Sequence, residues 1–285
     1  MRCFGEFLLC LMLAIGRSQS VFAEILRVCA DPNNLPFSNS QGQGFENHIA
    51  ELIAEDLGAR VSYTWWAQRR GYVRHTIRAG DCDIWMGVAD GVDMLSTTQP
   101  YYRSTYVFVT RANRHLNISS LDDPRLRSLL IGVQMVGDDA TNTPPAHALA
   151  RRGIINNVRG YMLYGDYNRP DPQRRIIDAV ASGALDIAIV WGPIAGYFAT
   201  KEPQAINITA VDPGADSETW PMAFNISMGV KHGNLAFKER IQKALNDKHY
   251  AILTVLSAYH VPVVSAPVHE IRANAQRQGL DTLNN

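Results

Sequence analysis

The 285 residues offer few side chains whose types and spacing suit catalysis. There is no G-x-S-x-G nucleophile elbow, no phosphate-binding G-x-x-x-x-G-K loop, no H-E-x-x-H zinc motif and no C-x-x-C pair. Gln41–Gly44 begins like a dinucleotide fingerprint, but Asn47 stands where the third glycine belongs. The eight histidines are scattered, without ligand spacing. The sequence therefore predicts a protein that is not an enzyme and that holds no cofactor and no metal ion.

A different set of side chains suits binding, because it lies in loops that follow apolar strand-like runs. These loops are Asp31–Ser38, Ala89–Thr97, Gly137–Thr143 and Trp191–Pro193. In open parallel sheets, ligands sit beyond the carboxyl ends of the strands. The stretch Trp65–Arg70 lies near the same rim, and Tyr102 belongs to the Pro-Tyr-Tyr exit from the lobe-one strand. The candidates for contact with a ligand or partner are Asp31, Phe37, Trp66, Arg70, Asp90, Tyr102, Asp138, Asp139, Asn142 and Trp191.

Several of these candidates have a structural alternative. Asp138 and Asp139 could ligate a hard cation, although no third carboxylate is near, and we favour a role in capping the helix that follows. Trp66 and Arg70 fit a contact in the cleft and a structural stacking role equally well. Trp65 alternates with Val61 and Tyr63, so we expect it in the core.

Alternating strand and helix patterns must position these loops. Strands are predicted at Leu26–Ala30, Val61–Trp65 and Asp83–Val88, with helices at Phe45–Leu57 and Tyr72–Ala79 between them. This β-α-β-α-β order implies a parallel sheet with right-handed crossovers. Asp171-Pro172 is interpreted as the cap and first residue of a later helix, and Trp191-Gly192-Pro193 as a sharp turn.

The sequence motif at the start of the third predicted strand occurs again later in the chain. Gly80-Asp81-Cys82-Asp83-Ile84 is echoed by Gly183-Ala184-Leu185-Asp186-Ile187, which indicates two α/β lobes of related build. Ser104–Thr110 and Met222–Val230 are apolar strands that can cross between the lobes. We therefore divide the chain into lobe one (24–110 with 224–265), lobe two (111–223) and a polar C-terminal tail (266–285).

The N-terminus predicts export. A basic start, an apolar core at Phe7–Ile15 and the small Ala23 form a signal-peptide pattern with cleavage after Ala23. That core is shorter than the about 20 residues of a membrane span.

Because 27 basic residues balance 27 acidic ones, we expect no attraction to nucleic acid. Of the remaining cysteines, Cys29 lies within a strand and Cys82 just before its neighbour, and we expect this offset to prevent a disulfide.

Several segments together resemble a known family. They include the segments Arg27–Pro32, Gly44–Asn47, Tyr63–Trp66, Tyr101–Val109, Gly132–Gln134 and Trp191–Pro193. The match resembles the periplasmic J-type proteins (MxaJ/XoxJ-like) that accompany quinoprotein methanol or alcohol dehydrogenases, within the polar-amino-acid branch of the periplasmic solute-binding proteins. It implies a two-lobed periplasmic binding protein type II fold, each lobe a mainly parallel sheet flanked by helices.

The resemblance also implies a function and an alternative to it. Amino-acid receptors of this type carry an arginine for the ligand carboxylate where Gly91 stands here, and an aspartate for the ammonium where Trp191-Gly192 stands. The missing anchors favour a periplasmic accessory protein that binds a quinoprotein (PQQ-dependent) dehydrogenase, apo or holo. The alternative is a transport receptor for a small molecule other than a free amino acid.

Overall fold

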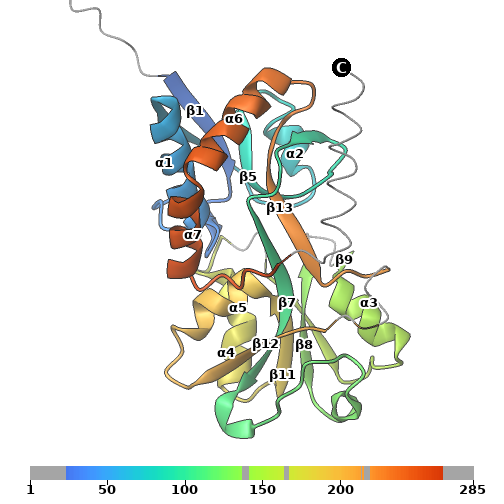
Figure 1. Ribbon diagram of the computed structural model, residues 1–285. Coiled ribbons are helices and arrows are strands. Elements are labelled where there is room, and N and C mark those ends of the chain that lie inside the picture. The colour runs from blue at the N-terminus through green and yellow to red at the C-terminus, as the bar shows by residue number, and fades with distance from the viewer. Residues whose placement is uncertain (1–23, 137–140, 164–166, 213, 215–218, 266–285) are drawn as a thin grey trace, which may run out of the picture.

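The computed structural model describes residues 24–136, 141–163, 167–212, 214 and 219–265. They form two lobes stacked end to end and joined by two long strands (Figure 1). The lobes share one continuous sheet with the strand order β10-β8-β11-β7-β13-β5-β1-β4. The predicted two-lobed α/β fold is thereby confirmed.

Lobe one is built on the parallel strands β1 (Glu24–Ala30), β4 (Ala59–Trp65) and β5 (Ile84–Ala89). The helix α1 (Phe45–Leu57) lies on one face of this sheet, because its apolar side chains recur at helical spacing. Gly58 ends α1 in a left-handed conformation with φ 66°, as glycine allows. Helices α6 (Leu235–Asp247) and α7 (His249–Ala258) pack against α1 on the same side (Figure 1).

Lobe two repeats this construction. Strands β8 (Ile131–Val136), β10 (Val158–Met162) and β11 (Ile187–Trp191) run parallel. The lobe's other regular elements are η1 (Ala112–Arg114), η2 (Pro124–Arg127), β9 (Thr141–Asn142), α3 (Pro144–Arg151), η3 (Pro172–Arg174), α4 (Arg175–Ala181), α5 (Gly192–Ala199) and β12 (Ile206–Ala210).

Two strands join the lobes. β7 (Tyr102–Arg111) pairs with β13 (Ala223–Lys231) through its first residues and with β11 and β12 through its last. Since β7 contributes to both halves of the sheet, the lobe boundaries stay a prediction. The short elements of lobe one are β2 (Asn33–Asn34), β3 (Ser38–Asn39), α2 (Tyr72–His75) and β6 (Leu95–Thr97).

Three local predictions were wrong. The helix predicted at Tyr72–Ala79 is regular only over four residues, because the β-branched Thr76 turns away from helical geometry and donates a hydrogen bond to Tyr72 O at 2.6 Å. Asp171 does not cap a helix with its side chain, and the segment that follows begins as the 3₁₀ turn η3. Gly192-Pro193 starts α5 instead of forming a turn, since proline suits the first turn of a helix.

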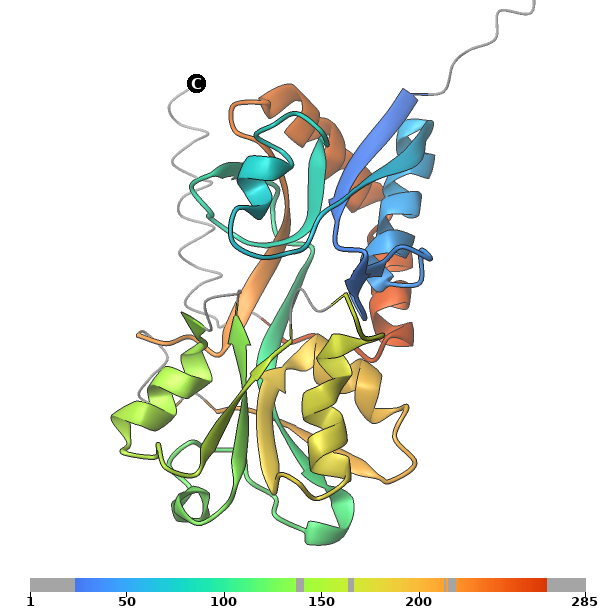
Figure 2. The same ribbon diagram turned by 180° about the vertical axis from the view of Figure 1, so that it is seen from behind.

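The prediction against a disulfide was also wrong. Cys29 and Cys82 are bonded, with their Cα atoms 5.4 Å apart. The strands are parallel neighbours as expected, but the chain bends just before β5. The bend brings Cys82 over the sheet face toward which Cys29 points, where both pack with Tyr72, Val73 and Ile77. This face is opposite to the one that α1 covers, and α2 lies against it (Figure 2).

Candidate functional site

The two lobes touch directly at the mouth of the cleft between them. Asn33 Nδ2 donates to Arg169 O at 2.8 Å, and Tyr167 Oη donates to Asp31 Oδ1 at 3.3 Å. Gln173 Nε2 donates to Asn34 Oδ1. We call these three contacts the interlobe latch. They join the two lobes by direct hydrogen bonds across the cleft.

Asp31 holds the lobe-one side of the latch. Its carboxylate accepts hydrogen bonds from Gln68 N at 2.7 Å and Asn33 N at 2.9 Å, and the residue is 3 % exposed. Burial raises the pKa of Asp31, and the two backbone N–H donors oppose that rise. Gln68 also accepts from Asn34 at 2.7 Å, so Asp31 orders the loop that carries the latch.

Behind the latch lies a cavity of about 110 Å³, which we call the interlobe cavity. Its lining residues are Phe37, Glu46, Gln68, Gly87, Tyr102, Trp191 and Ile226. Pockets for small-molecule ligands usually measure about 300 to 1,000 Å³. The cavity that the described residues form is therefore smaller than a typical ligand pocket.

Glu46 is a cavity residue that the sequence interpretation missed. It lies in the first turn of α1, is 8 % exposed and has no hydrogen bond or ion pair to its carboxyl group among the described residues. Burial raises its pKa to about 8. The carboxyl lies against Gly87 of β5, where a Cβ atom would collide with Oε1. A glycine inside an apolar strand signals such a close approach, and Gly87 was the available clue.

The structure brings together only part of the predicted site. Phe37, Tyr102 and Trp191 line the interlobe cavity, and Asp31 lies at its mouth. Asp90 is exposed and accepts a hydrogen bond from Thr97 Oγ1 at 3.2 Å, away from the cavity. Asn142 is exposed on β9, and Asp138 and Asp139 lie outside the described residues. Trp66 stacks on His75, with ring centroids 5.0 Å apart.

Arg70 belongs instead to a larger concavity on the outer face of lobe one, which we call the α2 groove. It measures about 630 Å³. Its rim carries Arg69, Arg70, Arg74 and Arg78, none of which forms an ion pair with a described residue. Its floor is apolar and contains Trp85, Val88, Val92 and the exposed Met94.

The resemblance predicts the lost anchors of an amino-acid receptor at Gly91 and at Trp191-Gly192. Gly91 has a φ of 77° with open space where a side chain would begin. A Cβ atom on Gly192 would lie 2.6 Å from Thr105 O, so a larger residue there requires a backbone shift. Neither position presents a charge to the cleft. Among the described residues there is also no cluster of three or more His, Cys, Asp or Glu side chains that could hold a metal ion.

Comparison with known proteins identifies the family. No protein-family model matches the chain. It is 29% identical over 249 residues to Protein MoxJ of Methylorubrum extorquens AM1, covering 85% of this chain and 82% of that protein. It is 30% identical over 254 residues to Protein MoxJ of Paracoccus denitrificans, covering 84% of this chain and 89% of that protein. The chain belongs to the MoxJ family.

A solved structure agrees with this assignment. The crystal structure of the periplasmic binding protein XoxJ from Methylobacterium extorquens AM1 is 32% identical and aligns with a TM-score of 0.70. The alignment covers 85% of this chain and 100% of XoxJ. The predicted resemblance is therefore confirmed. No helix of the described part of this MoxJ relative is long and apolar enough to cross a membrane.

Proposed function

We propose that this chain is a non-enzymatic periplasmic accessory protein of a PQQ-dependent methanol or alcohol dehydrogenase, which it binds directly during maturation or activation. Membership of the MoxJ family supports the proposal. The observation that carries it is the location of the open binding surface. The interlobe cavity is small and latched, whereas the α2 groove is about six times larger and open on lobe one.

The composition of the α2 groove points to its partner. An apolar floor binds apolar side chains, and the four guanidinium groups around it, which have no ion-pair partner in the described part of the chain, favour carboxylates. An amphipathic acidic segment on the surface of the dehydrogenase satisfies both requirements. Arginines on a rim also steer a charged partner and make its association sensitive to salt.

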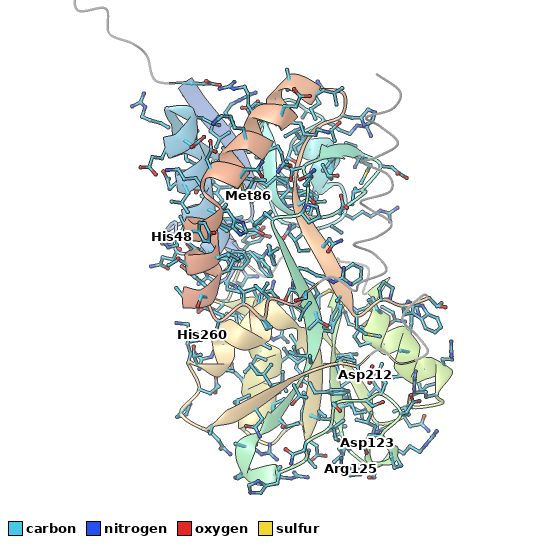
Figure 3. The ribbon with its side chains drawn as sticks, viewed as in Figure 1. His48, Met86, Asp123, Arg125, Asp212 and His260 are labelled. Carbon is cyan, nitrogen blue, oxygen red and sulfur yellow. A yellow bond between two sulfur atoms is a disulfide. The ribbon has the colours of Figure 1, made fainter. Side chains whose placement is uncertain are left out.

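The test is binding of the full-length mature chain to the purified dehydrogenase, in its apo and holo forms, by biolayer interferometry. We expect the double variant Arg70→Glu/Arg74→Glu to weaken binding by about tenfold or more, mainly through slower association. The matched control is Arg127→Glu, which reverses an exposed, unpaired arginine on η2 of lobe two. Figure 3 labels Arg125 and Asp123 of that region, at the far tip of lobe two.

Each outcome decides something. No association of either enzyme form with the unaltered chain, together with normal dehydrogenase activity in a deletion strain, contradicts the proposed function. Association that both variants reduce equally contradicts docking at the α2 groove. A concentration-dependent dimer of the chain in sedimentation, abolished by the Arg70→Glu/Arg74→Glu variant, assigns the groove to a second copy instead.

A second candidate function is a transport receptor for a small ligand other than a free amino acid. It is favoured by the aromatic side chains of Phe37, Tyr102 and Trp191 around the interlobe cavity. Receptors of this architecture close their lobes around a ligand by a hinge motion. Ligand binding must then raise the melting temperature by mass action. No shift with alcohols, quinones or amino acids, and unimpaired growth of a deletion strain on every transported solute, contradict this candidate.

A further inference from the structure

The walls of the interlobe cavity differ in chemical character. One wall carries the Glu46 carboxyl, which is more than nine-tenths buried and has no partner among the described residues. The remaining walls include three aromatic side chains, Phe37, Tyr102 and Trp191. No lysine or arginine lines the cavity, so nothing there neutralises a carboxylate.

We propose that the interlobe cavity binds a small alkylammonium ion, with its positive charge against the Glu46 carboxylate and its methyl groups against Phe37, Tyr102 and Trp191. Aromatic faces attract cations, and cages of such rings bind methylated ammonium groups. A carboxylate adds a charge-assisted hydrogen bond from any remaining N–H. This site is separate from the proposed docking surface and does not depend on it.

The size of the cavity limits the ligand. At about 30 Å³ for each water molecule, 110 Å³ corresponds to roughly four small heavy atoms. Methylammonium and trimethylammonium fit this limit, and a free amino acid with a long side chain does not. A hard metal ion is disfavoured, because Ca²⁺ takes six to eight oxygen ligands and the cavity offers a single carboxylate.

Binding of a cation is coupled to loss of a proton. Three tyrosines face Glu46 from neighbouring elements: Tyr63 on β4, Tyr72 on α2 and Tyr101 before β7. Burial keeps all three neutral, and Glu46 itself contributes to raising the pKa of each. Glu46 is therefore protonated at neutral pH in the empty cavity, and the bound cation requires its ionised form. We expect affinity to rise with pH and to level off above about pH 8.

The experiment is isothermal titration calorimetry of the full-length mature chain with methylammonium and trimethylammonium chloride, against potassium chloride at matched ionic strength. We expect saturable binding of the organic cations at one site, an affinity that increases from pH 6 to pH 8, and release of a proton to the buffer. The neutral isopropyl alcohol, which has the same four heavy atoms' worth of size as trimethylammonium, should bind at least about tenfold more weakly, because it lacks the charge.

Two variants of α1 distinguish binding at Glu46 from a general effect of removing a negative charge from the helix. Glu46→Gln removes the charge and should lower affinity at least about tenfold. Glu51→Gln changes an exposed glutamate of α1 and should leave affinity unchanged. If Glu46→Gln fails to fold, Trp191→Leu provides a second test, with an expected loss of severalfold. No binding by the unaltered chain, binding independent of pH, or equal affinity for the cation and the alcohol overturns the proposal.

Discussion

The interlobe cavity and the α2 groove both touch Gly87 of β5, yet they differ in size, charge and closure. The cavity measures about 110 Å³, carries one unpaired carboxyl and is closed by hydrogen bonds between the lobes. The groove measures about 630 Å³, is open and carries four arginines that pair with no carboxylate of the described residues. Each region therefore suits a different class of partner.

The receptor architecture is kept in part. The hinge strands β7 and β13 and the cleft between the lobes remain. At Gly91 and Trp191-Gly192, where the resemblance predicts the anchors of an amino acid, no charged side chain is present. The larger of these two concavities lies on the outer face of lobe one, where the Cys29–Cys82 disulfide joins β1 to the segment before β5.

The largest stability effect is expected from Glu46→Gln. The pKa of Glu46 is about 8 in the folded chain, whereas the ordinary pKa of a glutamate is 4.5. Folding therefore takes up a proton between these values, and stability falls as pH rises from about 4.5 to 8. Glutamine removes this loss, so the variant should exceed the unaltered chain by on the order of 4 kcal/mol at pH 8.5 and match it at pH 4.

Urea denaturation at both pH values measures this difference, with Glu51→Gln as the control that keeps the unaltered pH dependence. Parallel pH curves for Glu46→Gln and the unaltered chain would show that Glu46 ionises normally. The cavity would then lose the property that distinguishes it from the groove.

The Cys29–Cys82 disulfide is expected to affect both the stability of the chain and binding at the α2 groove. Cys29→Ala/Cys82→Ala removes a link across 53 residues and should destabilise the chain by about 3 kcal/mol. Because the bridge packs with Tyr72 and Val73 beneath the α2 groove, binding to the dehydrogenase should weaken. Calorimetric melting and interferometry measure the two effects. Retained partner affinity in a folded variant would separate the disulfide from the groove.

The smallest effect on stability is expected from a variant of the interlobe latch, and this effect should not reach the α2 groove. Gln173→Ala removes one buried hydrogen bond between the lobes, which contributes about 1 kcal/mol. We expect a larger radius of gyration in small-angle scattering and unchanged binding to the dehydrogenase. Gln99→Ala, an exposed glutamine outside the latch, serves as the control. An unchanged radius of gyration for Gln173→Ala would mean that other contacts hold the lobes closed.

The sequence predicted the fold well where local pattern decides the structure. The apolar face of α1, its Gly58 stop and the three parallel strands of lobe one were all legible from spacing. The disulfide was not, because a bend of three residues before β5 moves Cys82 out of line with its strand.

The site was predicted only in part for a related reason. Phe37 and Trp191 were found because loops after parallel strands converge at one edge. Glu46 was missed because a glutamate in the first turn of a helix is usually solvated there, and only its contact with Gly87 buries it. The arginines of the α2 groove gather through the shortening of α2, which propensity alone does not reveal.

The central claim is that this chain meets its partner through the α2 groove and not through the cleft. Hydrogen–deuterium exchange of the full-length mature chain, with and without the apo and holo dehydrogenase, tests it most directly. We predict protection of residues 69–78 and 85–94, with no change in the latch segments 31–38 and 167–173. Protection confined to the latch segments, with the groove unchanged, would contradict the account.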